Sequence, residues 1–195
     1  MENIHIQNAL SPSEYGGRSF IPPEIPERLI SLVNLPAGGI VLDAGGGTGR
    51  VAQFFRNQAA QVVVADQTIK MLREAQKKEG IQPLCTDVER MPFDNNSFDR
   101  SIMVYALHHV ANQVQTAWEL WRILKPGGWI VIEEPNIRSF GVKLIALFEK
   151  AALMRSHFLS PMQIADLFRM HDAHVQIEGE DSSSAWIVVA KESRK

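Results

Sequence analysis

Four glycines in the stretch VLDAGGGTGR, from Val41 to Arg50, could bind a small charged ligand. They directly follow an apolar run. Each glycine costs extra conformational entropy on folding, so this density indicates a backbone that something must approach closely. A turn without a ligand would need a single glycine. The stretch therefore predicts a ligand-binding loop, with Gly45, Gly47 and Gly49 as its contact residues.

The residues around this loop indicate what the ligand carries. Asp43, just before the turn, would repel a pyrophosphate but suits an ammonium or sulfonium charge. The dinucleotide fingerprint G-x-G-x-x-G fails, because its third glycine, counted from Gly45, is Arg50 here. A following helix would offer its N-terminal N–H groups to one carboxylate. S-adenosylmethionine carries all of these groups, so it is the predicted ligand, ahead of NAD or FAD.

The elements that must position this loop alternate along the chain. We expect helices at about 26–35, 48–57, 67–78, 112–124, 140–155 and 161–170, and strands at 38–44, 61–66, 81–87, 98–105, 129–134, 174–179 and 184–191, with a sharp KPGG turn at 125–128. Alternation predicts a parallel sheet with helices on both faces. The last two strands are too close in sequence for a parallel connection. The expected fold is α/β, a doubly wound, mostly parallel seven-stranded sheet with a C-terminal antiparallel hairpin.

Composition narrows the class of protein. The 195 residues suit one domain, which we divide into an N-terminal cap region (1–35), a cofactor-binding core (36–134), a substrate lid (135–160) and a C-terminal helix with hairpin (161–195). A net charge of −2 indicates no nucleic-acid partner. Cys85 is the only cysteine, so we expect no internal disulfide and no multi-cysteine metal site, and no cluster of acids and histidines has the spacing of metal ligands. Without a signal peptide or transmembrane segment, the expected location is cytoplasmic.

The segment D-A-G-G-G-T-G, Asp43 to Gly49, resembles the first motif of class I S-adenosylmethionine-dependent methyltransferases. VVVAD, CTDVERMPFDNNSFD, VYALHHV and RILKPGGWIVI match the same family in order and spacing. The pattern is most similar to type 11, which includes the ubiquinone and menaquinone C-methyltransferases. The resemblance implies a Rossmann-like fold, with S-adenosylmethionine as cofactor and S-adenosylhomocysteine as product.

The resemblance also implies roles for single residues. Asp66, 21 residues past the first glycine, would bind both ribose hydroxyls. Asp87 would face the adenine amine beside the Val88 backbone. Further expected cofactor contacts are Gln67, Val104 and Tyr15. The alternatives are that Asp66 caps the next helix, that Asp87 is an ordinary turn residue, and that Tyr15 is a surface tyrosine.

Catalytic candidates follow the fourth predicted strand. Methyl transfer needs a general base only where the acceptor atom carries a proton. Tyr105, His108 and His109 are placed for this role, and a histidine suits it by its ordinary pKa near 6.5. His157 is a further candidate. The alternative for all of them is packing or hydrogen bonding within the loop.

The segment from Glu133 to Pro161 carries two apolar stripes at helical spacing. Three interpretations compete: an apolar lid over the substrate, the face of a homodimer, or core packing. The lid interpretation predicts a small organic acceptor, apolar or aromatic. We therefore expect a methyltransferase acting on a small molecule. The alternative from another class is a catalytically silent S-adenosylmethionine-binding sensor or partner protein.

Overall fold

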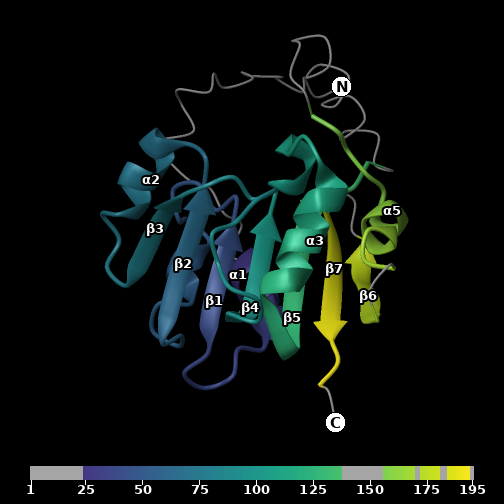
Figure 1. The fold of residues 1–195 in the computed structure, drawn as a ribbon, viewed down its shortest axis with the longest axis horizontal. Helices are drawn as coiled ribbons and strands as arrows, with labels where there is room; N and C mark the ends of the chain where they lie inside the picture. The colour runs from purple at the N-terminus through teal and green to yellow at the C-terminus, as the bar shows by residue number, and fades with distance from the viewer. Residues whose placement is uncertain (1–23, 138–155, 170–171, 181–183, 194–195) are drawn as a thin grey trace, which may run out of the picture.

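A seven-stranded sheet forms the centre of the computed structural model, which describes residues 24–137, 156–169, 172–180 and 184–193 (Figure 1). Its strands are β1 (Ile40–Ala44), β2 (Gln61–Asp66), β3 (Ile81–Cys85), β4 (Phe98–Val104), β5 (Leu124–Pro135), β6 (Ala173–Glu180) and β7 (Ser184–Lys191). Their order across the sheet is β3-β2-β1-β4-β5-β7-β6. Pro83 is tolerated within β3 because that strand lies at the edge of the sheet.

The first five strands pair in parallel, and β7 is antiparallel to both of its neighbours. β1 and β4 lie side by side although two strands separate them in sequence, so the chain reverses its direction of winding there. The predicted doubly wound α/β sheet with a terminal antiparallel pair is confirmed.

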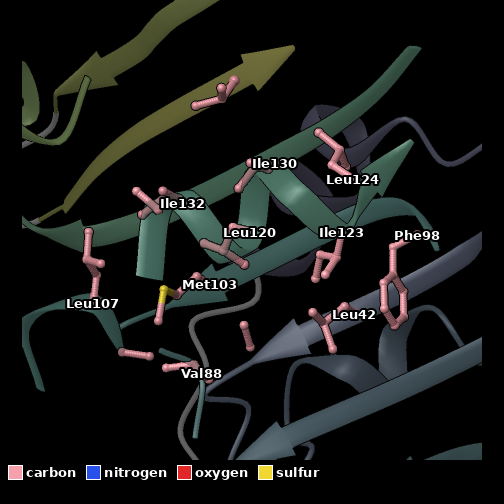
Figure 2. Close-up of a cluster of buried hydrophobic side chains, with 14 of the residues drawn as sticks. Leu42, Val88, Phe98, Met103, Leu107, Leu120, Ile123, Leu124, Ile130 and Ile132 are labelled. Atoms are coloured by element: carbon pink, nitrogen blue, oxygen red, sulfur yellow. The ribbon is translucent and has the colours of Figure 1, made fainter. Parts of the chain in front are cut away.

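Helices cover both faces of the sheet. They are α1 (Glu24–Val33), α2 (Ile69–Ala75), α3 (Gln113–Ile123) and α5 (Pro161–Asp166), with the short 3₁₀ helices η2 (Ala52–Phe54) and η3 (Leu107–His109). Alternate strand residues face opposite layers. In β4, Met103 packs with α3 and α5, whereas Ile102 packs with α1, η2 and α2. Figure 2 shows the first layer, where Leu120 and Ile123 of α3 lie over the sheet.

The prediction of a helix at 48–57 is wrong. The structure has turns there and only the three residues of η2 in a 3₁₀ helix. In an α-helix the Ala52 N–H would bond to the Thr48 carbonyl. Instead Ala52 donates to Asp43 Oδ2, and the Thr48 carbonyl accepts from Lys78 Nζ. Tertiary partners have replaced the helical pair.

The prediction that KPGG at 125–128 forms a sharp turn before the fifth strand is also wrong. These residues lie inside β5. Phe98 pairs with Leu124 and Arg100 with Trp129, so several residues of β5 bulge out between two paired positions. Gly127 permits the bulge with φ of +78°. The predicted helix at 140–155, both apolar stripes and Tyr15 lie outside the described residues. The four-part division of the chain stays a prediction.

Candidate functional site

The carboxyl ends of the parallel strands meet along one edge of the sheet, the upper edge in Figure 1. The glycine loop follows β1, Asp66 ends β2, and Tyr105 follows β4. In open α/β sheets, ligands bind at this edge, where the winding reverses. Here that point lies between β1 and β4.

The glycine loop is tied to its surroundings by backbone contacts. Gly45 donates its N–H to the Ala65 carbonyl at 2.7 Å. Gly45, Gly47 and Gly49 all have φ between +53° and +70°, a region that side chains rarely allow. A Cβ at Gly45 would lie 2.7 Å from the Ala106 Cβ. The loop therefore lies directly against the start of the segment that follows β4.

Asp43 lies beneath the loop and not at its mouth. Its side chain is almost fully buried, with the residue 1% exposed, and Oδ2 accepts the Ala52 N–H at 3.2 Å. A Cβ at Gly46 would lie only 2.4 Å from its Cγ, so Gly46 leaves room for the carboxyl. Burial raises the pKa of Asp43 to about 7. The predicted attraction for a cationic ligand would thus act through the loop.

Asp66 joins the glycine loop to the start of α2. Its Oδ2 accepts the Gly47 N–H at 3.0 Å, and its Oδ1 accepts the Thr68 N–H at 2.7 Å. The N-terminal cap of α2 is Thr68, so Asp66 supports the turn before that helix. A carboxylate oxygen accepts two hydrogen bonds. Each oxygen of Asp66 therefore retains acceptor capacity for a ligand hydroxyl.

The other predicted cofactor residues differ in exposure. Gln67 and Asp87 are exposed, whereas the side chains of Val88 and Val104 are buried in the two core layers. Asp87 Oδ1 accepts the Glu89 N–H at 2.9 Å, as a turn aspartate does.

The segment after Asp87 is fixed to α3 by two charged side chains. Glu119 Oε2 accepts the Met91 N–H at 2.7 Å, and Arg122 donates to the Phe93 carbonyl at 2.6 Å. Arg122 and Glu119 also form an ion pair. The sequence reasoning missed this support, which keeps the segment at the rim of the site.

Tyr105 is bound to the middle of the sheet. Its backbone has φ of +52°, unusual for a residue with a bulky side chain. Its hydroxyl donates to Glu133 Oε1 at 2.9 Å and also contacts Ser184 Oγ. Tyr105 packs on the layer of α1 and α2. The structure thus separates this candidate from the two histidines that follow it.

His108 is buried, with 5% of the residue exposed, and its ring contacts side chains on two sides. Its Nδ1 lies 2.6 Å from Glu134 Oε2, and its ring stacks on Phe158 at 4.6 Å between centroids. The other oxygen of Glu134 accepts the N–H groups of Ala106 (3.0 Å) and Leu107 (2.8 Å). One carboxylate therefore orients both the histidine and the backbone that carries it.

The two remaining histidine candidates lie beside this pair. The ring centroid of His109 is 3.9 Å from that of His108, and its Nδ1 lies 3.4 Å from Ser156 Oγ. His157 is exposed and donates its backbone N–H to the His108 carbonyl at 2.8 Å. Residues 156–158 therefore close over η3.

Glu134 and Phe158 were missed from the sequence. The pair of glutamates at the end of WIVIEE was a usable signal, because consecutive acids at the buried end of a parallel strand need partners. The sequence places Phe158 among the apolar residues of the predicted lid, but no local pattern predicts that it stacks on His108.

The residues at this edge of the sheet fit the chemical groups of S-adenosylmethionine. Gly47 places no side chain between the loop and α2, where a Cβ would meet Met71 Sδ at 3.1 Å. Beside Gly47, the carboxylate oxygens of Asp66 can accept hydrogen bonds from ligand hydroxyls. Among the described residues, no group of three or more acids, histidines or cysteines could hold a metal ion.

Residues 42–132 match the family described as "Methyltransferase domain" (Methyltransf_11). These residues form a type 11 methyltransferase domain of class I. The resemblance seen in the glycine loop and the later motifs is confirmed, and S-adenosylmethionine is the cofactor of this domain family. The described part of the chain has no helix that is long and apolar enough to cross a bilayer.

Curated relatives match about half of the chain. The ubiquinone/menaquinone biosynthesis C-methyltransferase UbiE of Coxiella burnetii is 34% identical over 54% of this chain and 46% of its own length. The mitochondrial 2-methoxy-6-polyprenyl-1,4-benzoquinol methylase of Caenorhabditis elegans is 33% identical over 52% and 40%, respectively. The match thus spans less than half the length of either relative.

Among solved structures, the YcgJ protein of Bacillus subtilis is similar to this chain over most of both molecules. The TM-score is 0.75, with 88% of this chain and 99% of that protein covered. The sequences are only 16% identical, so this likeness concerns the fold alone.

Proposed function

We propose that this methyltransferase domain transfers a methyl group from S-adenosylmethionine to a ring carbon of a small hydroxylated aromatic acceptor, such as a 1,4-quinol. The position of Asp66 is the observation that supports the cofactor part of this proposal. Its carboxylate accepts the Gly47 N–H and retains acceptor capacity beside three consecutive glycines, residues 45–47. This combination suits a ligand with a diol and a flexible polar tail.

In the proposed arrangement, Asp66 accepts hydrogen bonds from both ribose hydroxyls. The glycine loop provides backbone N–H groups and space for the methionine part. Asp87 and the Val88 backbone contact the adenine, with Gln67 at its edge. Asp43 stays beneath the loop, too buried for direct contact, and its ionised form, which is favoured only above a pH of about 7, attracts the cationic end through its charge.

The acceptor class is inferred from two observations. The relatives from Coxiella burnetii and Caenorhabditis elegans are named for quinone biosynthesis and for a benzoquinol. In this chain, His108, His109 and Phe158 form an aromatic cluster after β4. An aromatic ring of the acceptor would stack favourably beside such side chains.

The cofactor supplies an already activated methyl group. The chain's own contribution is to hold the acceptor atom in line with it and to exclude water. Such alignment lowers a barrier by up to about 7–11 kcal/mol. We propose that residues 156–158, which contact His108 and His109, cover the acceptor.

Two measurements on the whole chain test the proposal. Calorimetry should show binding of S-adenosylhomocysteine and none of NADH. With S-adenosylmethionine and a short-tailed 2-methoxy-6-prenyl-1,4-benzoquinol, kept reduced, mass spectrometry should show a product heavier by one methylene. Cofactor binding with no turnover on a panel of phenols, quinols and amines would favour the silent sensor. Binding of NADH alone would overturn both.

A further inference from the structure

We infer that Glu134 is a positioning residue that fixes the tautomer of His108, so that His108 Nε2 is the general base for the acceptor hydroxyl. The inference rests on the proposed function for the identity of the acceptor. The orientation of the pair rests on the structure alone. Neither the family match nor the relatives' names assign a role to Glu134.

The first step of the argument is the chemistry of the contact. A carboxylate accepts hydrogen bonds and donates none. Glu134 Oε1 already accepts two backbone N–H groups, so this side chain acts as a hydrogen-bond acceptor. The Nδ1 of His108, 2.6 Å from Oε2, must therefore be the donor. In the neutral ring this leaves the lone pair on Nε2, the form that a base requires.

The second step is rigidity. The His108 side chain is only 6% exposed, and Phe158 stacks on its ring with the planes 14° apart. Glu134 fixes the ring's rotation and also its backbone, through Ala106 and Leu107. A base held in this way loses little further freedom when the acceptor binds.

The third step compares the other candidates. The Tyr105 hydroxyl is bound to Glu133 and Ser184, on the opposite face of the sheet. His109 is exposed, and its Nδ1 lies 3.4 Å from Ser156 Oγ. His108 alone among the three combines a carboxylate partner with a buried ring.

The fourth step is position. Ala106 lies against Gly45, and His108 follows two residues later in η3. The pair is therefore next to the loop proposed for the cofactor. Among the described residues, the titratable side chains facing the ring are Glu134 from β5 and His109 from η3. The segment over η3 adds His157, which contacts His108 through its backbone.

The proton balance is simple. His108 Nε2 takes the proton of an acceptor hydroxyl, and the electron density gained by the ring makes its ortho carbon nucleophilic. That carbon bonds to the methyl group as the sulfur–methyl bond breaks and sulfur keeps the electron pair. The methylated carbon then loses its proton to water, and His108 returns its proton to the oxygen. One methyl is transferred and one proton released.

The test starts with the tautomer, which needs no turnover. Nitrogen-15 NMR of the histidine rings in the full chain, at a pH where His108 is neutral, should show Nδ1–H in the wild type. In Glu134→Gln, the amide oxygen can still accept the backbone N–H groups, and its NH₂ then faces Nδ1. His108 should switch to Nε2–H. A wild-type ring protonated on Nε2 overturns the inference, even if the variant fails to fold.

Kinetics then test the base, with the benzoquinol probe. His108→Asn should lower kcat about 100-fold or more, and Glu134→Gln about 10- to 100-fold, with S-adenosylhomocysteine affinity within twofold of wild type. The double variant should be no slower than His108→Asn, because the pair acts as a unit. Glu178→Gln, on the edge strand β6, is the matched control. Independent losses that multiply, or an unchanged kcat in Glu134→Gln, overturn the inference.

The two proposals fail differently. If wild-type protein binds S-adenosylhomocysteine but methylates none of the hydroxylated probes, the proposed acceptor is wrong, and the base role falls with it. The tautomer measurement still decides whether Glu134 orients His108.

Discussion

The two halves of the ligand-binding edge are built in different ways. Beside β1 and β2, the contacts are backbone N–H groups meeting the carboxylates of Asp43 and Asp66, within one stretch of about 25 residues. Beside β4 and β5, Glu134 also accepts backbone N–H groups, but here side chains contact one another as well, and His108, Glu134 and Phe158 come from separate parts of the chain. The first half suits one ligand shared by a whole family. The second half is the one that we propose binds the acceptor.

The largest expected effect is in the glycine loop, where substitution at one position should abolish ligand binding and substitution at another should lower stability. Gly47→Val should leave a folded protein that no longer binds S-adenosylhomocysteine, with affinity at least 1000-fold lower, about 4 kcal/mol. Its Cβ would lie 3.1 Å from the flexible end of Met71 and 3.8 Å from Asp66 Oδ2, and its φ of +53° should cost some stability without preventing folding. Gly45→Val should instead lower the melting temperature sharply, because its Cβ would overlap Ala106. Calorimetry and thermal unfolding of both variants distinguish the two. Unimpaired binding by Gly47→Val would refute the assignment of the loop.

The next effect concerns the pH dependence of stability. Burial raises the pKa of Asp43 from 3.8 to about 7, so between these values the folded state keeps a proton that the unfolded state releases. The free energy of unfolding should therefore fall as pH rises from about 4 to 7, by about 4 kcal/mol in all. Asp43→Asn should remove this contribution. Urea unfolding of both proteins across this range gives the difference, and parallel curves would contradict the prediction.

A smaller effect is expected at the proposed ribose contact. Asp66→Ala should weaken S-adenosylhomocysteine binding by about 1.5–3 kcal/mol, the scale of hydrogen bonds to a charged group. Part of the loss reflects the Gly47 N–H, which loses its acceptor. Asp166→Ala, on α5 and ion-paired with Arg169, is the matched control and should bind normally. Calorimetry at one salt concentration compares all three proteins. Equal affinities would leave Asp66 as a turn residue only.

The smallest effect is expected for Tyr105→Phe. The variant should lose about 1 kcal/mol of stability, because the hydroxyl bonds to Glu133 and Ser184 in the sheet. Its kcat on the benzoquinol probe should stay within twofold of wild type. A large loss of kcat at normal stability would indicate that Tyr105, and not His108, is the general base.

Much of the cofactor half was predictable from the sequence. Strand, glycine turn and acid are local patterns, and the φ values of Gly45, Gly47 and Gly49 confirm why glycine stands there. The sheet was predictable too, because alternation of strands and helices restricts how the chain can wind. The helix at 48–57 was the exception. Its apolar residues are spaced as in a helix, but contacts from Asp43 and Lys78 replace the helical hydrogen bond between Ala52 and Thr48.

The sequence by itself therefore determined the fold class, the glycine loop and the family, since each depends on residues close together in the chain. Only the tertiary structure decided that Asp43 lies beneath the loop and that Tyr105 and His108 serve opposite faces of the sheet. It alone joined His108 to Glu134, 26 residues away. The physical reason is that a side chain's partner across a sheet depends on strand order and register, which no local pattern of residues encodes.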